Sequence, residues 1–393
     1  MVRHEKLKYL AKLALLVLVG VFGSFLIAEA GLRLLNISYP VFHGFDPVRG
    51  RVLEPGMEGW FRYEGNAYFK INSAGFRDVE HPLQKPKGTY RILLLGDSYT
   101  EARQVSLENT FGRKVEQQLQ SCKRFLPHKV EVINFGVPGY GNAEELITLR
   151  SRGWAYDPDL VLTMFFSGND LIDNFPRAEL REHEYIPRPY FHLDQGELKL
   201  TYNFQEWSPP LLKYRLLLWG VHNFRTLELI NQANRVYAAR QMGEGQDNAL
   251  NQAGLAEFVY APPQTPIHRE AWTITEGILK LMHKEVREHH AKFFLVTTTS
   301  PDQLDQEQKV LLRQRLNAKE LDYPEQRLRA LGETEGFPVL NLLYDFQRHA
   351  EQHHVYLHGF PNTKLGAGHW NEQGNELAAQ LISKRICQDP SIL

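Results

Sequence analysis

The sequence has only two cysteines among its 393 residues, Cys122 and Cys387. Two thiols cannot build the disulfide framework of a small secreted protein, and they are too few for a cysteine-based zinc site. A hydrophobic core must therefore hold the fold together. With 43% apolar and 11% aromatic residues, the chain can bury one large α/β core or two smaller ones.

The chain also lacks an excess of charge of either sign. Lys and Arg together number 45, Asp and Glu number 46, and the net charge is -1. Proteins that bind nucleic acid usually carry a strong positive excess or a basic stripe. The composition therefore gives no support to a nucleic-acid partner.

A long apolar run lies near the N-terminus. Residues 13–28 carry no charge, and their apolar flanks lengthen them enough to span a bilayer as a helix. Four cations precede the run: Arg3, Lys6, Lys8 and Lys12. By the positive-inside rule, a transmembrane helix within residues 1–36 leaves the N-terminus in the cytoplasm and the rest of the chain on the extracytoplasmic side. We therefore expect a membrane partner.

The same segment allows a second outcome. Ala28-Glu29-Ala30 resembles a signal-peptidase site, and cleavage near Ala30 would release a secreted protein. The run is at the long end for a secretory signal, and cationic Arg33 follows closely. We favour an uncleaved signal-anchor over a cleaved signal, and both over a buried core helix.

Short apolar runs alternate with helical patterns from residue 88 onward. The expected strands cover residues 91–95, 130–134, 160–166, 293–298 and 339–343. This alternation predicts an α/β domain over residues 88–393, with helices covering a parallel sheet. Residues 176–265 interrupt it as an insertion with a helical stretch at 211–240. Residues 37–87, rich in Gly, Pro and aromatics, are expected to form a stalk and a small β extension.

A serine follows the first expected strand directly. Gly96-Asp97-Ser98 places a hydroxyl at the carboxyl end of a parallel strand, where open α/β sheets build their sites. Because a serine hydroxyl is a weak nucleophile without a base, a histidine is required. His369, in the loop before the C-terminal helix, is the candidate. Alone, Gly-Asp-Ser is a common turn, and one histidine among 16 means little.

Two further loops at this edge carry hydrogen-bond donors. The second strand leads into Gly136-Val137-Pro138-Gly139, whose glycines leave backbone N–H groups free to face an anion. The third leads into Gly168-Asn169-Asp170, which supplies a side-chain amide. On its own, the first loop is also consistent with a Gly-rich connector, and an isolated Gly-Asn-Asp is more often a plain turn.

Together, the blocks around Ser98, Gly139, Asn169 and His369 resemble the SGNH branch of the GDSL hydrolase family. Residues 71–77 also resemble the segment that precedes the first strand in membrane-anchored members. The resemblance implies a three-layer α/β/α, flavodoxin-like fold and a serine esterase without metal or cofactor. It implies Ser98 as nucleophile, His369 as general base, and an oxyanion hole of the Ser98 and Gly139 N–H groups and the Asn169 side chain.

The resemblance fails at one position. The family usually has an aspartate three residues before its histidine, and this chain has Gly366 there. A backbone carbonyl could orient His369 in a Ser-His dyad, a carboxylate such as Asp345 or Asp170 could reach it, or the site could be weakened. We favour the dyad, and predict that Gly366→Asp leaves activity intact or raises it.

The remaining candidates are a disulfide between the two cysteines and a metal site at a cluster of histidines. In this fold the helix ending at Cys122 and the helix containing Cys387 can be neighbours, and export would favour a disulfide over two buried thiols. His353, His354 and His358 form a cluster, but the two adjacent side chains project differently and no carboxylate pattern accompanies them. We expect a solvated surface there and no metal.

Three functions stay open at this point. The favoured one is hydrolysis of an ester in the cell envelope, borne by a polysaccharide or a lipid. The same residues would serve an O-acyltransferase in which a sugar hydroxyl replaces water. The third is a non-catalytic envelope protein that keeps the fold after losing the acid.

Overall fold

The computed structural model describes residues 2–175, 187–202, 204, 208–242 and 255–392. The chain divides into two compact units, one made of residues 1–41 and 209–246 and the other of residues 42–208 and 247–393. All the candidate catalytic residues belong to the second unit.

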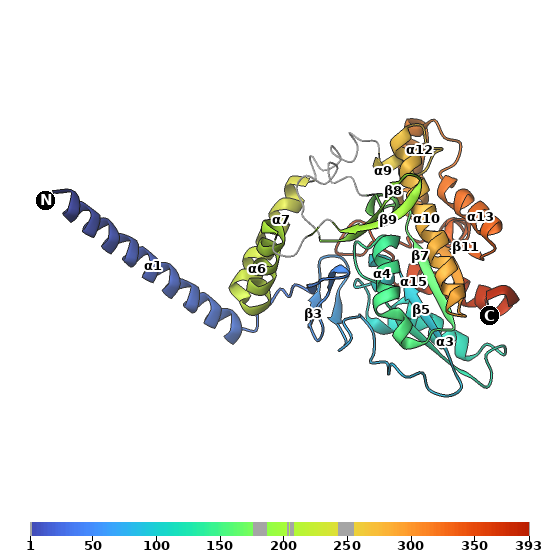
Figure 1. Ribbon diagram of the computed structural model, residues 1–393, viewed down its shortest axis with the longest axis horizontal. Helices are drawn as coiled ribbons and strands as arrows, with labels where there is room; N and C mark the ends of the chain where they lie inside the picture. Colours follow the sequence, from blue (N-terminus) through green and yellow to red (C-terminus); the bar gives the residue numbers. More distant parts are fainter. Residues whose placement is uncertain (1, 176–186, 203, 205–207, 243–254, 393) are drawn as a thin grey trace. The chain divides into compact units, whose positions relative to one another are not determined.

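A parallel sheet of five strands lies in the middle of the second unit (Figure 1), in the order β11-β10-β7-β5-β6. The strands are β5 (Thr89–Leu95), β6 (Lys129–Asn134), β7 (Leu160–Phe165), β10 (Lys292–Thr297) and β11 (Val339–Asn341). They coincide with the five apolar runs of the sequence. The three strands β5, β6 and β7 are buried along nearly their whole length, as expected for a parallel sheet covered on both faces.

Helices cover both faces of this sheet. On one face, Leu93 and Leu95 of β5 belong to a core with α4 (Asn142–Ser151), α10 (Pro266–Glu288) and α13 (Tyr323–Glu335). On the other, Ile92 and Leu94 belong to a core with α3 (Phe111–Gln120), α14 (Leu343–His353) and α15 (Glu372–Gln388). The three-layer α/β/α prediction is confirmed.

Shorter helices connect these layers. They are α2 (Ser98–Glu101), α5 (Asp170–Asp173), α9 (Leu255–Phe258), α11 (Pro301–Leu304), α12 (Gln306–Leu316) and the 3-10 turns Leu107–Asn109, Gly153–Tyr156 and Pro390–Ile392. Two of them, α2 and α5, begin just after β5 and β7, so they start at the edge of the sheet where the site residues lie.

The residues before the sheet form two antiparallel hairpins. One pairs β1 (His43–Asp46) with β2 (Gly50–Leu53), and the other pairs β3 (Glu58–Phe61) with β4 (Ala67–Lys70). Phe69 packs in a small core with Tyr140 from the loop after β6. The fully buried Arg77 donates to the carbonyl oxygens of Glu101 (2.9 Å) and Ala102 (2.5 Å). The extension is thus bonded to the loops that carry the site.

The segment expected to be an insertion is divided between the two units. The hairpin of β8 (Pro189–Asp194) and β9 (Glu197–Tyr202) belongs to the unit with the sheet. The helical stretch forms two helices, α6 (Pro209–Asn223) and α7 (Arg225–Met242), in the other unit. The rest of that expectation, at 176–186, 203, 205–207 and 243–254, lies outside the described residues.

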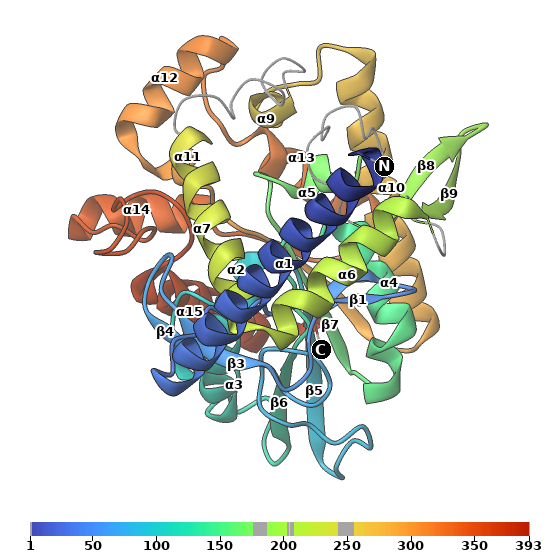
Figure 2. The ribbon, with the colours of Figure 1, turned by 90° about the vertical axis from the view of Figure 1, so that its left-hand side faces the viewer.

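The other unit contains the N-terminal helix α1 (Val2–Leu34). Within Lys8–Leu34, an 18-residue stretch has a mean hydropathy of 2.4, and none of that stretch is buried within the protein. A helix of this length and composition is able to cross a membrane or to serve as a signal sequence. Helices α6 and α7 share this unit with α1 (Figure 2).

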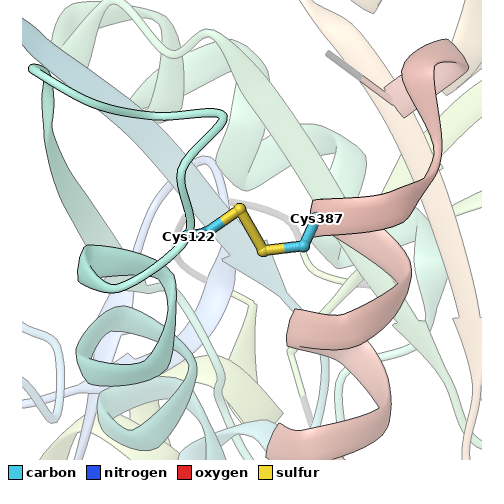
Figure 3. Close-up of a disulfide and its surroundings, with 2 residues drawn as sticks. All are labelled: Cys122 and Cys387. Carbon is cyan, nitrogen blue, oxygen red and sulfur yellow. A yellow bond between two sulfur atoms is a disulfide. The ribbon is translucent and has the colours of Figure 1, made fainter.

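The two cysteines form a disulfide (Figure 3). Cys122 follows α3, Cys387 lies near the end of α15, and their Cα atoms are 6.1 Å apart, within the range that a disulfide allows. The bond joins two helices that share one face of the sheet, as the sequence predicted on the condition of export. It links residues 265 positions apart, so it restricts the unfolded chain over most of the second unit, which we call the catalytic unit because it contains the candidate catalytic residues.

Candidate active site

The turn after β5 presents Ser98 at the carboxyl end of the central sheet. Asp97 caps α2 by accepting a hydrogen bond from the Tyr99 N–H at 2.9 Å, and Ser98 is the first residue of that helix. The turn is tight, because a Cβ atom at Gly96 would lie 2.0 Å from the Thr100 hydroxyl. The glycine two residues before the serine thus permits strand and helix to meet at this angle.

The structure brings His369 to this serine. Nε2 of His369 lies 2.8 Å from the Ser98 hydroxyl, a normal hydrogen-bond distance. The imidazole packs beside the Tyr99 ring, with 5.1 Å between centroids, and the Tyr99 hydroxyl donates to the carbonyl of Gly368 at 3.2 Å. The His369 side chain is 28% exposed, which leaves it accessible from solvent.

The other nitrogen of the imidazole meets a carboxylate. Nδ1 of His369 lies 2.6 Å from one oxygen of Glu64, and the second oxygen accepts the backbone N–H of His369, also at 2.6 Å. Gln104 adds a donor to Glu64 at 3.3 Å. Since an ionised carboxylate only accepts, Nδ1 carries the proton and Nε2 is left to accept from Ser98.

Burial and hydrogen bonding shift the pKa of Glu64 in opposite directions. Burial raises its pKa, but the hydrogen bonds and charge of His369 and the hydrogen bond of Gln104 outweigh it, so the pKa falls below the ordinary 4.5. Glu64 is therefore ionised at neutral pH. A negative charge at this position stabilises an imidazolium on His369.

This arrangement agrees with the alternative of a carboxylate from elsewhere in the chain and differs from the favoured Ser-His dyad. The acceptor is a carboxylate from outside the histidine loop rather than a backbone carbonyl, and it is neither of the two aspartates named. Asp345 pairs with Arg348 within α14. Asp170 lies buried under its own loop, accepts from the Phe166 N–H at 2.9 Å, and has its pKa raised well above the ordinary value by burial.

Position 366 is not beside the imidazole. A Cβ atom built on Gly366 would lie 3.1 Å from the Tyr356 ring and 3.6 Å from a carboxylate oxygen of Asp305. Its φ of +83° would also strain any other residue. An aspartate there would face the Asp305 carboxylate instead of the imidazole, so the structure gives no reason for Gly366→Asp to raise activity, and its effect on activity stays a prediction.

Sequence reasoning missed Glu64 because no motif marks it. It lies in the turn between β3 and β4, 305 residues before His369, and an acidic residue beside a glycine in a turn is typical of a solvated loop. The sequence carries one sign of this contact, the glycine at position 368. In the structure, a Cβ atom there would lie 2.1 Å from a Glu64 oxygen. The glycine before the histidine leaves space for a group from elsewhere.

The loops after β6 and β7 carry the two expected oxyanion donors. Gly139 has a φ of +75°, and its carbonyl accepts from Arg188 at 3.0 Å. Arg188 also contacts Asp173 at 3.0 Å, so a residue next to β8 braces this loop. Burial raises the pKa of Asp97 to about 6, and the Asn169 side chain acts on this pKa in the opposite direction. Both loops therefore adjoin the Ser98 turn, β6 and β7 being the neighbours of β5.

The histidine cluster is less uniform than expected. His353 and His354 are exposed, but His358 is buried, and its Nε2 lies 3.2 Å from the carbonyl oxygen of Thr299. The expectation of a solvated surface is wrong for His358, because its segment bridges to Trp370 beside the sheet. Among the described residues, no group of three or more His, Cys, Asp or Glu side chains could hold a metal ion.

The sequence over residues 92–199 matches the family of GDSL-like lipases and acylhydrolases. This chain carries a GDSL hydrolase domain. The GDSL match includes Ser98, Gly139 and Asn169, and it identifies a serine hydrolase of the esterase type. His369 and Glu64 lie outside the matched segment, so their places come from the structure alone.

Solved structures similar to this chain include two esterases. An acetyl xylan esterase, AlAXEase, is 11% identical with a TM-score of 0.38, over 75% of this chain and 99% of its own. A catalytic mutant of Axe2, an acetylxylan esterase from Geobacillus stearothermophilus, is 11% identical with a TM-score of 0.39, over 76% and 94% of the two chains. None of the curated proteins compared with the chain matches it in sequence.

Proposed function

We propose that this protein is a membrane-anchored serine esterase that uses Ser98, His369 and Glu64 as a catalytic triad on an ester of the cell envelope. The observation that carries the proposal is the continuous chain of contacts from the serine hydroxyl through both imidazole nitrogens to a carboxylate, at 2.8 Å and 2.6 Å. These are the contacts that activate a serine for attack on a carbonyl.

The reaction follows from these positions. His369 Nε2 takes the Ser98 proton as the hydroxyl oxygen attacks the ester carbonyl, and Glu64 stabilises the imidazolium that results. The N–H groups of Ser98 and Gly139 and the Asn169 amide would stabilise the oxyanion, each worth about 3 kcal/mol in better-studied acyl-transfer enzymes. The imidazolium then protonates the departing alcohol, and water, activated by His369, releases the acid and restores Ser98.

The presence of Glu64 weighs against the non-catalytic alternative. Loss of the aspartate at 366 would indicate a weakened site only if nothing replaced it, and the carboxylate of Glu64 contacts Nδ1 directly. An acyltransferase would use the same residues with a sugar hydroxyl in place of water. Nothing in the described residues favours it over hydrolysis.

The anchoring part of the proposal rests on α1. Its apolar portion Lys8–Leu34 follows Arg3 and Lys6, and the positive-inside rule therefore leaves the N-terminus in the cytoplasm and the catalytic unit outside. An exported domain also agrees with the Cys122–Cys387 disulfide, since such bonds persist in oxidising compartments. Protease added to intact cells should reach the catalytic unit.

A fluorophosphonate probe tests the chemistry directly. It should label the wild-type protein and fail to label Ser98→Ala, and hydrolysis of p-nitrophenyl acetate by that variant should fall by about 10⁵-fold or more, as in other serine hydrolases that lose the nucleophile. Ser391→Ala, which changes a serine in the C-terminal turn, is the matched control. Labelling or full activity of the Ser98→Ala protein would refute the proposal.

A further inference from the structure

Helix α6 carries an apolar face that nothing in its own unit covers. Leu212, Leu216 and Trp219 recur at spacings of four and three residues, so they share one side of the helix, and they are 46%, 60% and 61% exposed. Leu211 and Val221 on another side are buried. The helix therefore has one buried apolar side and a second apolar side that is exposed.

The end of this helix is fixed to the apolar helix α1. The Phe224 ring, between α6 and α7, lies 5.4 Å from the ring of Phe25 in α1 and 5.7 Å from that of Trp219. Glu29 of α1 accepts the Thr226 N–H at 2.9 Å, at the start of α7, and the Arg33 guanidinium at 2.7 Å. The exposed face of α6 is thus continuous with the end of the candidate membrane span.

The charged residues of α6 are also those expected for a helix beside a membrane surface. Its 15 residues contain Lys213 and Arg215 but no Asp or Glu. On a helical projection the two cations lie on either side of the stripe formed by Leu212, Leu216 and Trp219. An apolar stripe with a tryptophan, bordered by cations, is typical of helices that lie in the interface of a membrane with anionic lipids.

We propose that α6 lies in the headgroup region of the bilayer that α1 crosses, with Leu212, Leu216 and Trp219 directed into the acyl chains. This inference rests on the proposed anchoring by α1. It gives the protein a second membrane contact on the side where the catalytic unit would lie. The partner is the lipid surface itself, through apolar contact and the attraction of Lys213 and Arg215 for anionic headgroups.

Quenching of tryptophan by brominated lipid tests this placement. The full chain is reconstituted into phosphatidylcholine and phosphatidylglycerol vesicles whose lipids carry bromine on the upper part of the acyl chains. Subtracting the emission of Trp219→Phe from that of the wild type isolates Trp219 from the other tryptophans. We expect bromine to reduce this signal about twofold or more, because an interfacial helix buries its apolar face only ~5–10 Å into the boundary.

Two variants in the Trp219→Phe background serve as references. Leu217→Trp puts the probe on the same helix, at a position 56% exposed but turned away from the stripe, and should be quenched less. Phe22→Trp puts it on the exposed surface of α1 and should be quenched if α1 spans the bilayer.

The outcomes separate the inference from the anchoring. Quenching of the Phe22→Trp probe without quenching of Trp219 leaves α1 in the membrane and overturns the placement of α6. Absence of quenching at both positions refutes the anchoring and the inference with it. Protection of Trp219 from both brominated lipid and aqueous iodide means that protein covers the stripe, from the catalytic unit or a second copy, and overturns the inference as well.

Discussion

Ser98 and Glu64 contact the same imidazole, but they come from regions built in different ways. Ser98 follows a strand buried on both faces, whose position is fixed by its neighbours β6 and β7. Glu64 lies in the turn of a two-stranded hairpin outside the central sheet. Asn362 and Gln104 hold that turn from the catalytic loops. A unit that began at the first sheet strand would therefore lack the carboxylate that contacts His369, which we propose as the acid.

The strongest test of this comparison is Glu64→Gln. The amide keeps the shape of the side chain but loses the negative charge, so the imidazolium on His369 is less stabilised and its tautomer is less firmly set. We expect kcat to fall by about 10³–10⁴-fold, as for the acid of other triads. Steady-state hydrolysis of p-nitrophenyl acetate measures the loss.

The matched control is Glu58→Gln, in the strand β3 of the same hairpin. Glu58 pairs with Lys70 at 3.6 Å on the surface, and its side chain is 47% exposed. Its substitution should leave kcat unchanged. Equal losses in the two variants would mean that the hairpin matters only for folding.

The difference between the central sheet and the hairpin also explains which parts of the site could be predicted from the sequence. The five strands and their flanking helices follow from apolar runs, because a parallel sheet needs continuous burial that composition records. Ser98 and His369 could be proposed because short motifs accompany them at a strand end and a helix start. Glu64 could not, since its contact with His369 is set by how a hairpin folds back over 305 residues, and no local pattern encodes that distance.

His358 precedes His369 by 11 residues but differs from it in burial: it is almost fully buried, whereas the His369 side chain is 28% exposed. Burial lowers the pKa of His358 from 6.5 to about 4, although its hydrogen bond to the Thr299 carbonyl acts in the other direction. Between these pH values the unfolded chain binds a proton at this residue that the folded chain does not. The free energy of unfolding therefore falls as the pH drops from about 6.5 to 4, by on the order of 3 kcal/mol from this group.

Thermal unfolding of the detergent-solubilised chain at pH 7.5 and pH 4.5 measures this effect. Other buried groups also titrate, so the quantity to compare is the loss of Tm on acidification in the wild type and in His358→Gln. The variant should lose less. His353→Gln, at an exposed position of α14, should behave as the wild type, and an unchanged acid loss in His358→Gln would contradict the prediction.

Gly368→Ala tests the close contact between the loop that carries His369 and the hairpin turn that carries Glu64. The added Cβ would lie 2.1 Å from a Glu64 oxygen, so the carboxylate or the loop must move. A displacement of about 1 Å at a catalytic contact can cost about 10²-fold in rate, and we expect a loss of that size in kcat. Gly336→Ala is the control, because Gly336 has a similar φ of +78° but no atom within 4 Å of its Cβ position. Similar losses in both would indicate backbone strain alone.

The smallest effect is expected at Asn362, which ties the hairpin turn to the loop that carries His369. Its side chain accepts the Gly65 N–H at 3.0 Å and donates to the carbonyls of Gly65 at 2.9 Å and Arg62 at 3.1 Å. Removing these bonds in Asn362→Ala loosens Glu64 without touching it. A net loss of about 1 kcal/mol, or roughly fivefold in kcat, is expected, because the freed backbone groups can turn to water.

A double-mutant cycle decides whether this loss acts through the acid. If Asn362 works by positioning Glu64, then Asn362→Ala should lower kcat in the wild type and have almost no further effect in Glu64→Gln, where the charge is already gone. Asn109→Ala, which removes a hydrogen bond to Glu372 away from the hairpin, should leave kcat unchanged in both backgrounds. If instead the Asn362 substitution lowers kcat by the same factor in both, its effect does not pass through Glu64, and the turn is held in place by Gln104 and strand pairing alone.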